Sequence, residues 1–333
     1  MKKCVFVLAL LFAFALSSCT YPSAPQTRVY YDYFDTVITV TGCDGDFDAT
    51  CEKIEEILKK YHGLCDIYMD GVLKTVNETA GTAPVTVSDE LFDLLVYAKD
   101  AHAKTNGKCS VAFGAVTSVW HEYRSRALDG DVAVPSADEL RLASEHTDID
   151  DLALDREKKT VYFLDPELKL DLGAFAKGWV ADVIVNELRS LGKTNYAVSV
   201  GGTVTATGPK PNGDGWMVGV ENPSDGASMS YTARVSVADG FALATSGSYQ
   251  RYYEADGVRY HHIIDTETLM PENELLSVTV AAPTAALADV LSTAVFCMSV
   301  EDGKALAEEL GVELLWVLSD GTVIMTDDFP KMK

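Results

Sequence analysis

Residues 171–178 have the sequence Asp171-Leu172-Gly173-Ala174-Phe175-Ala176-Lys177-Gly178. This stretch predicts a strand that ends at Asp171, a tight turn at Gly173 and an amphipathic helix over residues 174–191, closed by Gly192. The start of a helix presents free backbone N–H groups and the positive end of its dipole, an arrangement that favours phosphate. Lys177 would oppose that dipole unless an anion lies nearby. The plainer alternative is a capped helix with Lys177 in solvent.

The segments on both sides of this stretch mix short strands with helices. Alternating apolar residues predict strands at residues 30–41, 161–164, 196–200, 204–207, 216–220, 232–237, 260–264 and 277–281, and a final hairpin around Asp320-Gly321. Helical spacing and capping residues predict helices at residues 47–61, after Ser88, from Ser136 to about Glu145, at 285–298 and from Asp302 to Gly311. This order is neither a regular βα alternation nor all-β. It predicts an α+β fold with a largely antiparallel sheet and flanking helices.

The chain is strongly acidic. It has 27 Lys and Arg residues against 50 Asp and Glu residues, a formal net charge of −23 over 333 residues. This balance argues against nucleic acid as a partner, because few cations are left to neutralise a phosphate backbone. A phosphorylated ligand would therefore need local devices: a helix start, a metal ion or a few placed cations. Hydrophobic residues make up 47% of the chain, an ordinary globular composition that excludes wholesale disorder.

The N-terminal residues are predicted to be a targeting signal. Lys2 and Lys3 precede a short apolar run over residues 5–16, and the sequence Leu16-Ser17-Ser18-Cys19 resembles the lipobox of bacterial lipoproteins. This resemblance implies cleavage before Cys19, lipidation of Cys19 and a location on the extracytoplasmic face of the cell membrane. Residues 1–18 would be the signal peptide, 19–28 a tether and 29–330 a single domain. An ordinary signal peptide with a chance cysteine is the alternative.

Five further cysteines have wide, irregular spacing: Cys43, Cys51, Cys65, Cys109 and Cys297. The sequence contains no CxxC pair, so a zinc site is not expected. If Cys51 and Cys65 share one helix, they lie about 21 Å apart, far beyond the reach of a disulfide. We expect mostly free, buried thiols.

The predicted helix at residues 285–298 is apolar except for Asp289, Ser292 and Thr293. The i, i+3, i+4 spacing places these three residues on one face. A carboxylate on a buried helix is costly unless it is paired or binds a metal, and oxygen donors suit Mg²⁺. A buried hydrogen-bond network is the alternative.

Two other polar segments could contribute to a site. His262 and Asp265 lie three residues apart at a predicted strand end, where a histidine near a carboxylate could act as a base or as a hydrogen-bonding clamp. Such a pair is more often structural. Thr245-Ser246-Gly247 is predicted to open a polar loop that runs to Arg251, and Gly201-Gly202 suits a sharp bend or a close approach to a ligand.

A series of short motifs runs in order through nearly the whole chain after the tether. They are Tyr33-Phe34-Asp35-Thr36, Asn77, Thr105-Asn106-Gly107-Lys108 through Trp120-His121, residues 171–178, Gly201-Gly202, residues 216–220 with Asn222-Pro223, Thr245-Ser246-Gly247-Ser248-Tyr249, His262-Ile263-Ile264-Asp265 and Ala288-Asp289-Val290-Leu291-Ser292-Thr293. Together they resemble the ApbE family of FAD:protein FMN transferases, in which a lipobox is common. The resemblance implies an ApbE-like flavin transferase fold.

The resemblance also implies an activity. Members of this family bind FAD and Mg²⁺ and transfer FMN to a Thr or Ser hydroxyl of a partner protein as a phosphoester, with release of AMP. The acceptor would be an exported or membrane-bound redox protein with a Thr-containing motif, and FAD would be the substrate.

The family's site residues can be carried over to matching positions of this chain. The backbone carbonyl of Ala174 and the side chains of Asp289 and Thr293 would hold Mg²⁺. The residues implied in FAD contact are Asp171, Lys177, Ile264 and the segment Cys109-Ser110-Val111, with Phe34 and Tyr68 lining the flavin pocket. Asp289 and His262 would be the catalytic residues, with His262 as a base or a phosphate-positioning group.

The chain departs from the family pattern at four places. Phe34-Asp35-Thr36 replaces the commoner Met-Gly-Thr, and Cys109-Ser110 replaces the commoner Phe-Asp, which puts one polar contact to FAD in doubt. Ser292 stands where some members have a second Asp ligand. Thr266 replaces the usual Pro.

Three rival functions remain open at this stage. An FAD pyrophosphatase, which would split FAD into FMN and AMP with water, would use the same residues. A non-catalytic flavin-binding lipoprotein would need the pocket without the metal-binding face. A structural surface lipoprotein would leave the series of motifs unexplained.

Overall fold

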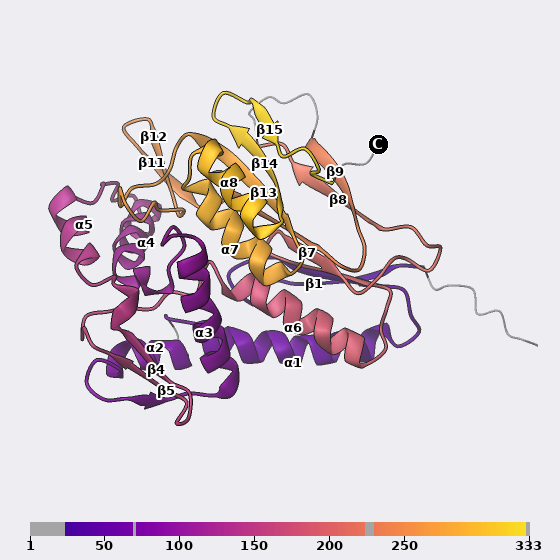
Figure 1. Cartoon of the computed structure of the whole chain (residues 1–333), viewed down its shortest axis with the longest axis horizontal. Helices are drawn as coiled ribbons and strands as arrows, with labels where there is room; N and C mark the ends of the chain where they lie inside the picture. Colours follow the sequence, from indigo (N-terminus) through magenta and orange to yellow (C-terminus); the bar gives the residue numbers. More distant parts are fainter. Residues whose placement is uncertain (1–23, 69–70, 224–229, 331–333) are drawn as a thin grey trace, which may run out of the picture.

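The computed structural model of the chain describes residues 24–68, 71–223 and 230–330. Its largest element is an eight-stranded sheet with the strand order β1-β2-β6-β7-β10-β13-β14-β15, in which every neighbouring pair is antiparallel (Figure 1). The strands are β1 Gln26–Tyr30, β2 Ile38–Gly42, β6 Tyr196–Val200, β7 Thr203–Ala206, β10 Ala242–Gly247, β13 Leu275–Ala282, β14 Glu313–Leu318 and β15 Val323–Met325. The predicted α+β class with a largely antiparallel sheet is confirmed.

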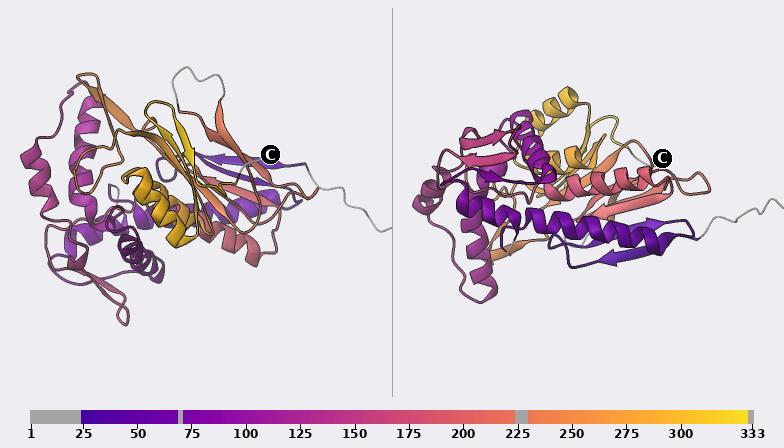
Figure 2. Two further views of the ribbon diagram at one scale, coloured as in Figure 1. Left: turned by 45° about the horizontal axis from the view of Figure 1, so that its top comes forward. Right: turned by 90° about the horizontal axis from the view of Figure 1, so that it is seen from below.

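Helices α6 (Ala176–Ser190) and α7 (Ala285–Phe296) pack together on this sheet, and α1 (Phe47–Cys65) lies beside α6 (Figures 1 and 2). Ten of the twelve residues of α7 are buried, as expected for a helix that is apolar on all sides. Helix α8 (Val300–Leu310) packs against β14. The hairpin of β8 (Trp216–Glu221) and β9 (Tyr231–Val237) has its own apolar cluster with the main sheet, which includes Leu243 and Leu315.

The remaining elements gather at one end of the sheet, on the left in Figure 1. They are α2 Val72–Thr79, α3 Asp89–Lys104, α4 Gly114–Leu128, α5 Ala137–Ser144, a small sheet of β3 Val85–Thr86, β5 Thr160–Phe163 and β4 Leu152–Asp155, and the hairpin of β11 Tyr252–Ala255 with β12 Val258–His261. A cluster that includes Trp120, Tyr253 and Ile264 joins α4 to the hairpin. This cluster holds α4 next to the segment that follows β12.

The predicted first strand at residues 30–41 is wrong. The chain forms two antiparallel strands, β1 and β2, in which Tyr30 lies opposite Ile38. The loop between them has no Gly or Pro to signal a turn. Phe34 (φ 55°) and Asp35 (φ 50°) make the turn instead by adopting the left-handed conformation. The assigned tether at residues 19–28 also ends too late, since the pairing of β1 begins at Gln26.

The predicted polar loop from Thr245 is wrong as well. Thr245, Ser246 and Gly247 are the last residues of β10, which lies between β7 and β13. The hydroxyl of Thr245 is satisfied by Thr279 on β13 at 2.9 Å, so a polar residue is tolerated inside the sheet.

Helix α4 was not predicted either. The N-cap of α8 is Ser299 rather than Asp302, because the Ser299 hydroxyl accepts the Asp302 N–H at 3.1 Å.

The predicted free thiols are confirmed for the five cysteines in the described ranges, and Cys51 and Cys65 do share α1. Cys19 and the predicted signal peptide lie outside the described residues. Among those described, no helix is both long enough and apolar enough to cross a bilayer.

Candidate active site

The start of α6 is joined to the middle of α7 through Asp289. This carboxylate is 4% exposed and accepts two hydrogen bonds, from the Gly178 N–H at 2.9 Å and from the Thr203 hydroxyl at 3.1 Å. The two helices approach closely because position 178 has no side chain. A Cβ there would lie 2.4 Å from the carbonyl oxygen of Ala285 and 2.6 Å from the Cβ of Asp289.

The Gly178 bond has a consequence for the carbonyl of Ala174. In a regular helix the N–H of residue 178 donates to the carbonyl of residue 174. Here it donates to Asp289, and α6 begins at Ala176, two residues later than the sequence predicts. No backbone N–H in the described part of the chain donates to the Ala174 oxygen. This oxygen is therefore available to a ligand, as the family resemblance implies.

Thr293 lies one helical turn after Asp289 on α7. Its hydroxyl is 3.4 Å from the Ser246 Oγ of β10. Ser292 has a different role from the one that its helical spacing suggests. It is 1% exposed, donates to the Asp289 carbonyl at 2.8 Å and lies 2.8 Å from the Ser246 Oγ. Ser292 thus braces α7 against the sheet, whereas Thr293 stays partly open.

Lys177 supplies positive charge at this point. Its ammonium donates to the Gly173 carbonyl at 2.7 Å and lies 3.5 Å from the Asp289 Oδ2. Gly201 (φ 58°) allows the backbone to pass close to the Lys177 side chain, since a Cβ there would lie 3.0 Å from the Lys177 Cδ. Within residues 24–68, 71–223 and 230–330, no group of three or more His, Cys, Asp or Glu could hold a metal ion. A cation here would instead share one carboxylate with hydroxyl, carbonyl and water oxygens.

Asp171 is held by its neighbours on three sides. Its carboxylate accepts from the Thr117 hydroxyl and from the Gly173 N–H, both at 2.8 Å, and its own N–H donates to the Val111 carbonyl at 2.8 Å. The side chains of Cys109 and Val111 are buried. Burial also raises the pKa of the Cys109 thiol well above its usual value. Of the predicted FAD-contacting segment 109–111, only backbone atoms and the half-buried Ser110 are left to face a ligand.

One face of α4 continues the site away from Asp171. Thr117, His121 and Arg124 follow one another at helical spacing on this face. The ring of Tyr68 stacks on His121, with ring centroids 4.5 Å apart. Arg124 donates to the Nδ1 of His121 at 3.0 Å. Burial, and then the charge of Arg124, lowers the pKa of His121, so its ring is neutral and acts as an acceptor.

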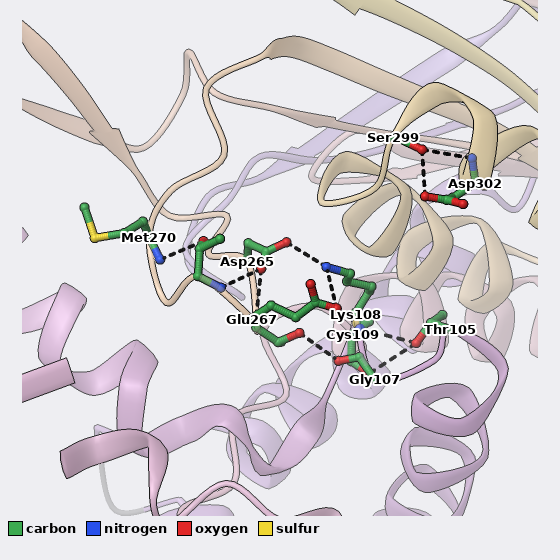
Figure 3. A network of polar contacts seen from close by, with 11 residues as sticks. Thr105, Gly107, Lys108, Cys109, Asp265, Glu267, Met270, Ser299 and Asp302 are labelled. Atoms are coloured by element: carbon green, nitrogen blue, oxygen red, sulfur yellow. Dashed lines mark hydrogen bonds and ion pairs between the residues drawn. The ribbon is translucent and has the colours of Figure 1, made fainter. Parts of the chain in front are cut away.

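His262 and Asp265 do not form the pair that their spacing suggests. Asp265 lies 2.9 Å from the ammonium of Lys108 and accepts the backbone N–H groups of Glu267 and Thr268. Figure 3 shows its contacts with Lys108 and Glu267. Asp265 is therefore structural. His262 is an exposed residue, and desolvation of its ring, followed by the charge of Arg251, lowers its pKa below the usual value. At neutral pH the ring is therefore uncharged, and one ring nitrogen has a lone pair that can accept a hydrogen bond.

The loop between β1 and β2 closes the other side of the site. The backbone N–H of Phe34 donates to the Nδ1 of His62 at 3.3 Å, and the two rings meet edge-to-face. The guanidinium of Arg251 donates to the carbonyl of Asp35 and lies 3.5 Å from the Asp35 carboxylate. Roles for Arg124, Arg251 and His121 were not predicted from the sequence. For the residues of α4, the spacing of 117, 121 and 124 was the available signal.

Ile264, the last predicted FAD contact, is 7% exposed and belongs to the cluster between α4 and the β11–β12 hairpin. The structure brings parts of several elements together at the site. They are the start of α6, the middle of α7, one face of α4, the β1–β2 loop and the segments that follow β10 and β12.

The chain resembles one family along nearly all of its length. The model of the ApbE family matches residues 34–316. An FAD:protein FMN transferase of Treponema pallidum is 36% identical over 270 residues, covering 76% of this chain and 72% of the relative. An FAD:protein FMN transferase of Vibrio cholerae is 32% identical over 278 residues, covering 83% of this chain and 79% of the relative.

Solved structures show the same similarity. The ApbE protein of Thermotoga maritima superposes with a TM-score of 0.84 at 27% identity, covering 93% of this chain and 100% of that one. The flavin transferase ApbE of Vibrio cholerae superposes with a TM-score of 0.78 at 28% identity, covering 92% of this chain and 97% of that one.

Proposed function

Because the chain belongs to the ApbE family, we propose that it is an FAD:protein FMN transferase whose reaction depends on Mg²⁺. It moves FMN from FAD to a Thr or Ser hydroxyl of a redox protein and releases AMP. Two relatives that are more than 30% identical over most of the chain carry the name of this activity.

The observation that carries the Mg²⁺ part is the diverted hydrogen bond at Gly178. It leaves the Ala174 carbonyl without a helical donor next to a buried carboxylate, Asp289, and one turn from the hydroxyl of Thr293. These are hard oxygen donors, and Mg²⁺ takes few protein ligands and keeps several waters. The ammonium of Lys177 lies 3.5 Å from Asp289, so it would compete with a metal ion for this carboxylate unless the pyrophosphate balances both charges. When bound, Mg²⁺ would neutralise charge on the pyrophosphate.

The residues of the chain divide the remaining work. The start of α6 and Lys177 face the pyrophosphate, and a neutral His262 accepts the proton of the acceptor hydroxyl. The hydroxyl oxygen then forms a bond to the phosphorus on the FMN side. The bond from that phosphorus to the oxygen shared with AMP breaks, and AMP leaves with both electrons of that bond. Asp171, fixed by Thr117 and Gly173, orients the substrate.

The proposal extends to where the enzyme works. Lipidation of Cys19 would hold it on the extracytoplasmic face of the cell membrane, where an exported or membrane-bound acceptor is found. Cys19→Ala should move the protein from the membrane fraction to the aqueous fraction. A Cys19→Ala protein that stays in the membrane fraction would contradict the lipid anchor.

Mass spectrometry tests the reaction directly. The protein is mixed with FAD, Mg²⁺ and a Thr-containing peptide from a candidate redox subunit. We expect the peptide to gain one FMN with loss of water, and AMP to appear in equal amount. Asp289→Asn should abolish the gain, whereas Asp302→Asn, an exposed aspartate at the start of α8, should not.

Other results identify the rivals. Free FMN and AMP with several unmodified acceptor peptides would indicate an FAD pyrophosphatase. FAD that binds and stays intact would indicate a flavin-binding lipoprotein.

A further inference from the structure

A largely buried ion pair joins two turns that lie far apart in the sequence, the 105–108 turn after α3 and the 265–270 turn after β12. The ammonium of Lys108 lies 2.9 Å from the Asp265 carboxylate and 3.1 Å from the Glu267 carboxylate (Figure 3). The side chains of Lys108 and Asp265 are 16% and 7% exposed, whereas that of Glu267 is 75% exposed. Lys108 and Asp265 are therefore the buried part of this contact, and Glu267 is its exposed part.

The 105–108 turn is a fixed support for the Lys108 side chain. The Lys108 N–H donates to the Thr105 carbonyl at 3.0 Å, and the buried Thr105 hydroxyl accepts the Cys109 N–H at 3.3 Å. Two residues after Cys109, the Val111 carbonyl accepts the Asp171 N–H at 2.8 Å. The backbone that carries Lys108 thus continues directly into the site.

The 265–270 turn is closed on itself and behaves as one unit. Asp265 donates its N–H to the Met270 carbonyl at 2.9 Å, and its carboxylate accepts the Glu267 N–H at 2.7 Å. The Thr266 hydroxyl donates to the Gly107 carbonyl at 3.2 Å, which is a second contact with the 105–108 turn. A hydrogen bond between charged groups is stronger than one between neutral groups. The place of the 265–270 turn therefore depends mainly on Lys108.

His262 lies three residues before Asp265, next to this turn. Its N–H donates to the Arg251 carbonyl at 3.1 Å, and two buried isoleucines separate it from the ion pair. The backbone of His262 is therefore held on one side by Arg251 and on the other side by Lys108, through Asp265. Because the His262 side chain is exposed, its direction depends on this backbone more than on packing around the ring.

Loss of Lys108 would disturb this arrangement more than loss of an exposed cation would. Removing one partner of a buried ion pair leaves the other charge uncompensated, whereas an exposed pair contributes little. Without Lys108, the Asp265 carboxylate must turn toward water or take up a proton. Either change shifts the 265–270 turn and the residues just before it.

We propose that Lys108 is a positioning residue for the transfer: its ion pair with Asp265 fixes the 265–270 turn and so places His262 for the acceptor hydroxyl. The proposal rests on the proposed function in taking His262 as the proton acceptor. Lys108 acts through His262 and not on the substrate. Its loss should therefore matter only while His262 is present, which a purely structural ion pair would not require.

A double-mutant cycle tests this dependence. The rate of peptide modification is measured at saturating FAD and Mg²⁺ for the unaltered full-length protein, Lys108→Met, His262→Gln and the variant with both changes. Lys108→Met should slow transfer about tenfold in the unaltered protein, as expected for a misplaced reacting group, but by less than about twofold in His262→Gln. The affinity for FAD should change by less than about twofold in Lys108→Met.

Further variants separate charge from shape. Lys108→Arg keeps the ion pair and should retain most of the rate, and Glu267→Gln should change the rate by less than about twofold because Glu267 is exposed. Lys60→Met, which removes an exposed ion pair with Glu90 at 2.6 Å, is the matched control and should leave the rate unchanged. If Lys108→Met does not fold, the cycle is run with Lys108→Met/Asp265→Asn, which removes the ion pair without leaving a buried charge.

Equal losses with and without His262 would overturn the proposal, and so would an unchanged rate in Lys108→Met. A readout without any acceptor separates this test from that of the proposed function. The Cε1–H resonance of His262 should move in Lys108→Met and stay in place in Lys60→Met, and an unmoved resonance in Lys108→Met would also overturn the proposal. If the unaltered protein modifies no peptide, the transfer is contradicted, and the resonance alone decides whether Lys108 positions His262.

Discussion

Gly178 donates its backbone N–H to the carboxylate of Asp289 at 2.9 Å, across the contact between α6 and α7. One turn further along α6, Asp182 accepts the N–H groups of Ala285 and Ala286 at 2.9 and 2.8 Å and so fixes the first turn of α7. The two helices are therefore joined at both ends of a short contact. The position of Asp289 depends on this contact as much as on α7 itself.

Gly178→Ala should damage both stability and activity. The new Cβ would lie 2.4 Å from a backbone oxygen that cannot swing away, so α6 and α7 would have to separate. We expect a loss of about 1–3 kcal/mol in the free energy of unfolding, measured by urea denaturation, together with loss of transfer. Gly63→Ala in α1 is the control. Nothing lies within 4 Å of its new Cβ, so it should be neutral or stabilising, and equal damage in both variants would contradict the close-contact argument.

Thr293 should matter through its hydroxyl and not through its shape. Thr293→Val keeps the volume but removes the oxygen, and we expect the Mg²⁺ concentration for half-maximal transfer to rise at least about tenfold. Thr293→Ser should retain most of the Mg²⁺ response. Equal Mg²⁺ responses in Thr293→Val and the unaltered protein would exclude Thr293 as a ligand.

His261 should make the fold sensitive to acid. Its Nδ1 accepts the Ile263 N–H at 3.2 Å, its Nε2 contacts the Glu272 carbonyl, and burial lowers its pKa from 6.5 to about 4. The unfolded chain therefore binds a proton more readily than the folded one. The stabilising contribution is complete above pH 6.5 and is lost as the pH falls to 4, by up to about 3 kcal/mol.

Urea denaturation at several pH values measures this loss. His261→Gln should flatten the curve between pH 6.5 and 4. An unaltered slope in His261→Gln would assign the acid sensitivity to other groups.

His262 should stay neutral in the free protein. Because desolvation and then the charge of Arg251 lower its pKa, its Cε1–H resonance should titrate below pH 6.5, with His262→Gln providing the assignment. His262→Gln should also slow transfer by about a hundredfold or more while FAD binding is kept. A titration at or above pH 6.5 would show that neither desolvation nor the neighbouring cations lower this pKa.

The sequence predicted the parts of the site that lie in regular patterns. The turn at Gly173, the helix that follows it and the polar face of α7 follow from spacing and meet in the structure, but no strand ends at Asp171 and α6 begins at Ala176. The sequence could not show that Gly178 redirects its N–H to Asp289, because that bond joins residues 111 positions apart. It also gave no sign that Phe34 and Asp35 would turn the chain with positive φ.

Strand β10 was missed for a related reason. The polar residues at its end are satisfied by neighbours that only the fold supplies, such as Thr279 for Thr245. Thr117, His121 and Arg124 have helical spacing in the sequence, but only the fold brings this face of α4 to Asp171 through the Thr117 hydroxyl.

If Cys19 carries the proposed lipid, the early start of β1 limits how far the enzyme can work from the membrane. Pairing with β2 begins at Gln26, seven positions after Cys19, and seven residues can span at most about 25 Å. The same strand runs directly into the loop that carries Phe34 and Asp35. The catalytic centre would then lie close to the membrane surface, and an acceptor would have to present its hydroxyl near the lipid headgroups. Inserting residues between Cys19 and Gln26 would widen the set of proteins that the enzyme can reach without changing its chemistry.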